Sequence, residues 1–169
     1  ERQSFLLLAL ADRGDAAAMP TLLDAASRGP QKLRLTAVGI LDRLGSVGSM
    51  PTLLKVAADP DAELSSAALA ALARLPGPGV DSALLELFRS ATGKNREVLI
   101  TLAGQRHMER ALPEIVRAAA EPEAGIRRAA AQAIGILGGD AQAGDLARLL
   151  EQTRNPAERA DLEAALLAI

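Results

Sequence analysis

The sequence predicts an all-α fold, a right-handed α-solenoid of stacked antiparallel helix pairs, from its composition and from a 31-residue repeat. Apolar residues make up 49% of the 169 residues, yet there are only two Phe and no Tyr or Trp. A core of Leu, Ala, Val and Ile favours thin, closely packed helices, because the pleated surfaces of sheets are rich in aromatic and β-branched residues. The repeat then arranges these helices in pairs.

The repeat is visible as a copied segment. The letters MPTLL at 19–23 recur at 50–54, and weaker copies follow at 81–85, 112–116 and 143–147. In the second half of a repeat, apolar residues lie four, eight and eleven positions after the first one, which places them on one face of a helix. Leu10 lies one period before Leu41. The fifth copy needs one inserted residue near Asn155-Pro156. We therefore expect a single domain with a half-repeat at 1–14 and five repeats at about 15–45, 46–76, 77–107, 108–138 and 139–169.

Each repeat is predicted to be a helix–turn–helix. First helices are expected at 16–27, 47–58, 80–90, 110–120 and 141–152, and second helices at 31–44, 62–75, 94–105, 124–137 and 157–168. Turn signals such as Gly29-Pro30 lie within repeats, and Gly138-Gly139 lies between them. Pro20, Pro51 and Pro113 fall about one turn into the first helices, where we expect a mild bend at most.

The segment 126–138, with the letters IRRAAAQAIGILG and preceded by Glu121-Pro122-Glu123, resembles the second helix of a HEAT-like repeat. The variant is the short bacterial kind noted in phycobilisome-lyase-type proteins. The resemblance covers essentially the whole chain and implies a segment of a larger multi-domain bacterial protein. It implies no particular activity, because this scaffold carries many unrelated functions.

Residue inventory argues against the enzymes of this fold. Its two-iron hydroxylases need several His–Glu pairs, whereas the chain has one histidine, His107. Its DNA glycosylases use a basic groove with aromatic side chains, whereas this chain has a net charge of −2 and no Trp or Tyr. The chain also has no Cys and therefore no thiolate nucleophile. We predict a non-enzyme without cofactor or metal, and without a nucleic-acid or membrane partner; neither a cytoplasmic nor an exported location is favoured.

The second helices should line the concave face of the solenoid. The predicted stripe on that face consists of Leu35, Gly39, Arg43, Ser66, Ala70, Arg74, Glu97, Thr101, Gln105, Arg128, Gln132 and Ile136. These side chains are mostly small or polar and include no aromatic anchor, so the stripe suits an extended or helical segment of another protein. The main hypothesis is a protein-interaction or spacer scaffold; the alternative is a small-molecule-binding or lyase-like accessory subunit that uses the same groove.

The third repeat departs from its neighbours in charge. Its candidate basic cluster consists of Lys94, Arg96, Arg106, His107 and Arg110. Such a cluster can bind an anion or an acidic partner. The alternative is that Met108 replaces a missing leucine after a shifted helix end, and that Arg106 extends into water.

Charged and apolar residues elsewhere receive structural interpretations. We expect Asp59, Asp61, Glu121 and Glu123 to cap second helices and to pair with Arg34, Arg96, Arg127 and Arg159 of adjacent repeats, rather than to do acid–base chemistry or bind a cation. Phe5, Leu6 and Leu10 at one end, and Leu162, Leu166 and Ile169 at the other, predict exposed apolar patches. Such ends favour weak end-to-end self-association of the chain.

Overall fold

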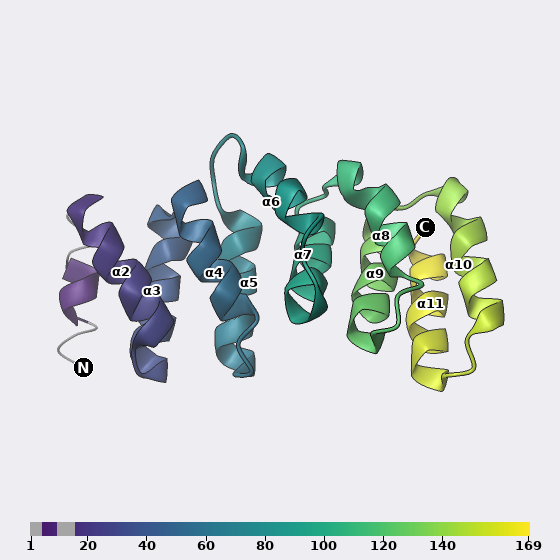
Figure 1. Ribbon diagram of the computed structural model, residues 1–169, viewed down its shortest axis with the longest axis horizontal. Helices are drawn as coiled ribbons and strands as arrows, with labels where there is room; N and C mark the ends of the chain where they lie inside the picture. The colour runs from purple at the N-terminus through teal and green to yellow at the C-terminus, as the bar shows by residue number, and fades with distance from the viewer. Residues whose placement is uncertain (1–4, 10–15) are drawn as a thin grey trace. The chain divides into compact units, whose positions relative to one another are not determined.

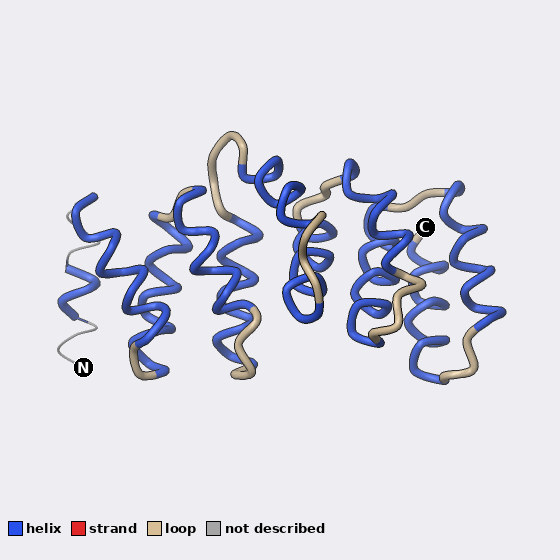
Figure 2. Tube along the Cα trace, in the orientation of Figure 1, coloured by secondary structure: helices blue, strands red, loops and turns tan. Residues whose placement is uncertain are grey.

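The computed structural model describes residues 5–9 and 16–169, and every regular element in that part of the chain is a helix (Figure 1, Figure 2). The α-helices are α2 (Met19–Arg28), α3 (Gln31–Leu44), α4 (Met50–Ala57), α5 (Ala62–Arg74), α6 (Val80–Phe88), α7 (Gly93–Gln105), α8 (Leu112–Ala118), α9 (Ala124–Leu137), α10 (Asp140–Gln152) and α11 (Pro156–Ala168). The predicted all-α class is confirmed. All five predicted second helices match α3, α5, α7, α9 and α11 to within one residue at each end.

The chain divides into two compact units, Glu1–Ala83 and Leu84–Ile169, with the division inside α6. We call them the N-terminal unit and the C-terminal unit. The predicted half-repeat belongs to the first of these; residues 5–9 are helical, whereas its key residue Leu10 lies outside the described residues. The single domain of five repeats stays a prediction.

In the N-terminal unit, α2 packs on α3, α4 packs on α5, and the second helices α3 and α5 pack on each other. Leu22, Leu41, Leu53 and Leu64 are at most 1% exposed and form the core between these helices. Ala37 on α3 is fully buried, as is the corresponding Ala68 on α5. Small side chains at this seam let the helices approach closely.

In the C-terminal unit, glycines lie in the seams between the second helices. α9 packs against α7 on one side and α11 on the other. A Cβ at Gly104 of α7 would lie 3.3 Å from the Ala133 Cα, and one at Gly135 of α9 would lie 3.0 Å from the Ala165 Cα. The backbone of α9 is therefore in near contact with both neighbours, so its position is fixed by backbone as well as by side chains.

The three prolines begin α-helices instead of lying about one turn inside them. Pro20, Pro51 and Pro113 each lie at the start of an α-helix, and each α-helix follows a 3₁₀ turn: η1 (Ala16–Ala18), η2 (Val47–Ser49) or η3 (Glu109–Ala111). Proline has no N–H to donate along an α-helix, but it fits the first turn, where amides lack a helical acceptor.

The end of α7 takes a form that the neighbouring repeats do not have. His107 has a left-handed φ of 52°. Its N–H donates to the Gly104 carbonyl at 3.1 Å, and the Met108 N–H donates to the Ala103 carbonyl at 2.9 Å. This pair of bonds is a Schellman motif, in which the position of His107 usually holds glycine. Met108 is only 6% exposed, as expected if it replaces the missing leucine after a shifted helix end.

Candidate functional site

Arginines at corresponding positions of the repeats each bind two partners. Arg34 on α3 donates from Nε to the Ala26 carbonyl near the end of α2 at 3.0 Å, and pairs with Asp59 of the next repeat at 2.6 Å. Such an arginine satisfies a carbonyl left open at the end of its own first helix and also joins the following repeat. We call this set of contacts the arginine ladder.

The same contacts recur in the C-terminal unit. Arg96 on α7 donates to the Phe88 carbonyl at 3.1 Å, pairs with Glu121 at 2.6 Å, and stacks 5.3 Å from the centre of the Phe88 ring. The predicted pairing of Arg34 and Arg96 with an acidic residue of the adjacent repeat is therefore confirmed. The ladder arginines stabilise the array and leave no free charge for a ligand.

Two predicted contacts of the ladder are wrong in their partner. Arg127 donates to carbonyls of the α8–α9 turn and pairs with Glu158 on α11. Arg159 donates to the Leu150 carbonyl at 3.0 Å and pairs with Glu163 of its own helix at 3.6 Å. The acidic ladder position of the fifth repeat is taken by a neutral residue, so Arg127 reaches past the turn to the first carboxylate of α11.

The predicted helix caps are also confirmed only in part. Asp61 accepts bonds from the amides of Glu63 and Leu64 at 3.0 and 3.1 Å, and so caps α5 as expected. Glu123 lies at the N-cap position of α9 but makes no side-chain cap bond, so that prediction is wrong. At the ladder position of the second repeat, Ser65 donates to the Ala57 carbonyl at 2.6 Å and performs only the capping half of the arginine's role.

Two carboxylates of the ladder have a lowered pKa. The pKa of Asp59 lies below its ordinary value because the backbone N–H of Asp61 and the Arg34 guanidinium both donate to it. The pKa of Glu158 is lowered by the hydrogen bond from Arg127 and by a second from the Thr153 hydroxyl. Donors of this kind stabilise the ionised carboxylate over the protonated one.

None of the twelve residues of the predicted stripe is buried. In the N-terminal unit, a Cβ at Gly39 would meet no atom within 4 Å, so this part of α3 borders open space. Nearby, Arg74 on α5 makes a two-point ion pair with Asp42 on α3, at 3.0 and 2.8 Å, which raises the pKa of Arg74. In the C-terminal unit, Ile136 on α9 is 51% exposed. Each unit thus offers its share of the stripe to solvent, and its partner-binding role stays a prediction.

The predicted basic cluster contains fewer free charges than the sequence indicates. Lys94 pairs with Glu97 at 2.7 Å, and Arg96 belongs to the arginine ladder. Arg106 is half-buried and also has a partner within the chain, whereas His107 and Arg110 are exposed. The binding of an anion at this cluster stays a prediction, and fewer unpaired cations support it than the sequence indicates.

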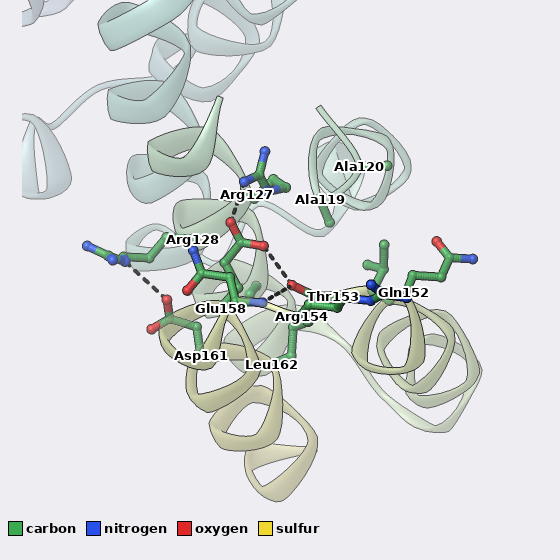
Figure 3. Close-up of a pocket in the computed structure, with 13 residues that line it drawn as sticks. Ala119, Ala120, Arg127, Arg128, Gln152, Thr153, Arg154, Glu158, Asp161 and Leu162 are labelled. Atoms are coloured by element: carbon green, nitrogen blue, oxygen red, sulfur yellow. Dashed lines mark hydrogen bonds and ion pairs between the residues drawn. The ribbon is translucent and has the colours of Figure 1, made fainter. Parts of the chain in front are cut away.

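A hollow of about 590 Å³ lies in the C-terminal unit, between the end of α8, the first turns of α9 and the α10–α11 connection (Figure 3). We call it the α9–α11 pocket. Ala119, Ala131 and Leu162, which line it, are buried. Along its side, Arg127 pairs with Glu158 and Arg128 with Asp161, and Figure 3 shows the Thr153 hydroxyl at Glu158 as well.

We did not expect this pocket, although the sequence contains two signals for it. One was the residue inserted near Asn155-Pro156, which places the start of α11 one residue later than the 31-residue period predicts. The other was Gln152, which takes the position of Asp59 and Glu121. Gln152 and the residues of the α10–α11 connection, Thr153, Arg154 and Asn155, all line the pocket.

The described residues contain neither a metal site nor a membrane-spanning helix. Among residues 5–9 and 16–169, no three or more His, Cys, Asp or Glu side chains are grouped so that they could hold a metal ion. No helix in the same part of the chain has the length and apolar character needed to cross a membrane.

Comparison with known proteins identifies the family. The model for HEAT repeats matches residues 19–98 and 82–167. The chain belongs to the HEAT repeat family. The HEAT repeat assignment covers nearly every described residue, and it confirms the resemblance noted at 126–138. No match to this HEAT repeat chain was found among curated proteins.

A solved structure supports the fold of the HEAT repeat chain. A designed armadillo repeat protein in complex with the peptide (KR)4 matches with a TM-score of 0.50 and 17% identity, over 96% of this chain and 84% of that one. A second designed armadillo repeat protein matches at a TM-score of 0.46 and 18% identity, over 96% and 85%. The first match, together with the all-helical structure, confirms the predicted all-α solenoid class.

Proposed function

We propose that the chain is a non-catalytic protein-binding module that holds an extended or helical segment of a partner against the exposed stripe of its second helices. The observation that carries the proposal is the accessibility of that stripe. Its side chains are mostly small or polar, and open space borders Gly39. A low, accessible surface beside a rigid core lets a peptide backbone approach closely, while the core keeps the contact points fixed.

The similarity to a solenoid in complex with a peptide supports the same proposal. The designed armadillo repeat protein is in complex with (KR)4, so a fold of this class is compatible with a bound peptide. Its identity to this chain is only 17%, and the similarity is therefore one of fold. Which peptide sequence this chain binds depends on the chain's own surface, which is mixed in charge.

The test is to select binders from a random peptide library on the purified chain and to measure their affinity by fluorescence anisotropy. Two variants fill the stripe, Gly39→Trp in the N-terminal unit and Gln132→Trp in the C-terminal unit. The control Lys55→Trp adds the same bulk at an exposed position of α4, on a first helix. We expect a stripe variant to weaken binding by about tenfold or more, because the added ring blocks approach of the peptide. Equal affinities for all three variants, or a selection without binders, would contradict the proposal.

The alternative of a small-molecule-binding accessory subunit makes a different prediction. A ligand held in the groove should copurify with the chain and add a discrete mass in native mass spectrometry. Such a mass, lost in Gln132→Trp and kept in Lys55→Trp, would favour the alternative over peptide binding. We expect the mass of the chain alone.

A further inference from the structure

We propose that the α9–α11 pocket binds a carboxylate of the partner, an aspartate or glutamate next to an apolar side chain, with Arg154 as its ion-pair partner. The inference rests on the proposed protein-binding function and gives the chemistry of one site within it. Three properties of the pocket carry it: its charge, its apolar lining and its continuity with the stripe.

The charge of the pocket is positive after its internal pairs are counted. Three arginines and two carboxylates line it, and both carboxylates are already engaged. Glu158 accepts from Arg127 and from the Thr153 hydroxyl, and Asp161 accepts from Arg128 at 3.0 Å. Arg154 is exposed and makes no hydrogen bond or ion pair with any residue of the described chain. The one charge left for a ligand is thus a guanidinium, which prefers a carboxylate or another oxyanion.

The lining requires an apolar group beside that carboxylate. Ala119, Ala131 and Leu162 are each at most 7% exposed and form an apolar surface in the hollow, and Leu149 adds to it. A volume of about 590 Å³ is sufficient for more than one side chain. Polar groups at the rim with an apolar interior are typical of a pocket that takes one apolar anchor and orients it by a few polar contacts.

The pocket is continuous with the predicted stripe. Arg128 belongs to both, because it begins the stripe on α9 and also lines the pocket. A peptide lying along Gln132 and Arg128 therefore reaches the pocket without leaving the surface of the C-terminal unit. The carboxylate therefore lies directly next to the peptide segment that contacts the stripe of α9.

The test uses three fluorescein-labelled peptides of alternating leucine with glutamate, glutamine or lysine, titrated against the full chain. The wild type should bind the glutamate peptide, and added salt should weaken that binding because the charges are exposed to solvent. Arg154→Ala should weaken it about five- to tenfold, since one charge-assisted contact is lost. Arg154→Lys should restore part of the affinity, and Ala120→Phe should weaken binding by filling the mouth of the pocket.

The control is Arg148→Ala, which removes an exposed arginine of the same unit that pairs with Asp145 outside the pocket. It should leave the affinity unchanged. Because Arg154 is exposed and unpaired, its variants should keep the thermal midpoint of the wild type, so that a loss of binding is not a loss of fold. Failure of the wild type to bind the glutamate peptide, or equal affinity for the glutamate and glutamine peptides, would overturn the inference. Equal binding by the wild type and Arg154→Ala would overturn it as well.

Failure of this inference can be told apart from failure of the proposed function. Library peptides whose binding depends on Gln132 and not on Arg154 would leave the protein-binding proposal intact and overturn the pocket assignment. Binding that depends on Arg154 but on neither Gly39 nor Gln132 would contradict the stripe, and the pocket would then be a site that binds alone.

Discussion

A single arginine of the ladder both caps the end of a helix and joins two repeats, roles that separate residues usually have in helical proteins. The side chain of Arg34 closes the end of one helix through the Ala26 carbonyl and joins the next repeat through Asp59. Its side chain is 18% exposed, so both bonds form at the edge of the core, where screening by water is weaker than on the open surface. Stability at this position therefore depends on the ionised state of the carboxylate.

The chain should lose stability in acid. Asp59 and Glu158 have a lowered pKa in the folded state, so the ladder contributes fully above their ordinary pKa values and is lost as the pH falls through the lower, folded values. We expect urea midpoints to be flat from neutrality down to about pH 4.5 and to fall below about pH 4. Asp59→Asn should be less stable at pH 7, and the gap to wild type should narrow in acid. Glu151→Gln, at an exposed residue of α10, is the control; a constant gap for Asp59→Asn would refute this assignment.

His107 is held in a backbone conformation that costs energy. A left-handed conformation is unfavourable by about 1 kcal/mol for a residue with a Cβ, and glycine avoids that cost. Since the His107 side chain is exposed, His107→Gly loses little packing and should stabilise the chain by about 0.5–1 kcal/mol in urea unfolding. Gln105→Gly, inside the last turn of α7, should destabilise it by a similar amount. Destabilisation by His107→Gly would mean that the imidazole makes a contact that matters.

At the scale of elements, the sequence predicts the second helices well because the 3.6-residue pattern and the turn signals agree there. The first helices were predicted less exactly, since proline forces each of three α-helices to start after a 3₁₀ turn. Arg127 shows why the candidate sites were harder. Its position in the repeat predicts an acidic partner, but Gln152 is neutral and only the folded turn brings Glu158 within reach. The α9–α11 pocket beside Arg127 lies next to an inserted residue, and the repeat period cannot predict the effect of an insertion on the structure.

Close packing between the second helices limits the side-chain volume that each position at their contacts accepts. Ala130 is fully buried on α9, so Ala130→Leu should overpack the seam and cost about 1–3 kcal/mol. Gln132 is exposed two residues away, and Gln132→Leu should change the free energy of unfolding little. Equal losses for the two variants in thermal or urea unfolding would show that the faces of α9 are assigned wrongly.

Two glycines of the stacked helices should respond to alanine in opposite directions. At Gly135 a Cβ would lie 3.0 Å from the Ala165 Cα, and a backbone atom cannot move aside, so Gly135→Ala should destabilise the chain. At Gly39 the new methyl group meets open space, and Gly39→Ala should stabilise α3 by about 0.5–1 kcal/mol because alanine restricts the unfolded chain. Circular dichroism melts of both variants and of the double variant give the comparison.

At the scale of the whole molecule, each compact unit has its own core, and apolar side chains remain exposed toward both ends of the chain. Phe5 is 71% and Leu6 63% exposed, and Leu167 on α11 is 89% exposed. The expectation for the last helix was wrong in one residue: Leu162 is buried, because it packs inward on α11, whereas Leu167 is the exposed leucine. Leu6 and Leu33 also line an N-terminal hollow of about 560 Å³.

These exposed residues lead us to expect weak self-association of the chain. A leucine such as Leu167 of one molecule fits the apolar hollow beside Leu6 of another, and burying it is favourable by about 1.5–3 kcal/mol. Sedimentation velocity should show a concentration-dependent dimer that Leu167→Glu abolishes. Glu163→Gln, an exposed change on the same helix, should leave it intact. A monomer at all concentrations for the wild type would contradict the expectation.

The arginine ladder also determines which repeat can be copied to build a longer array. A repeat inserted in tandem needs both halves of the contact, the acid toward the preceding copy and the arginine toward the following one. The fourth repeat carries both, as Glu121 and Arg127, whereas the second has Asp59 with Ser65 and the third has Ser90 with Arg96. Duplicating residues 108–138 would thus place each new Arg127 before another Glu121. Of the five predicted repeats, this one is complementary to itself, and it is therefore the template that we would choose for extending the protein by design.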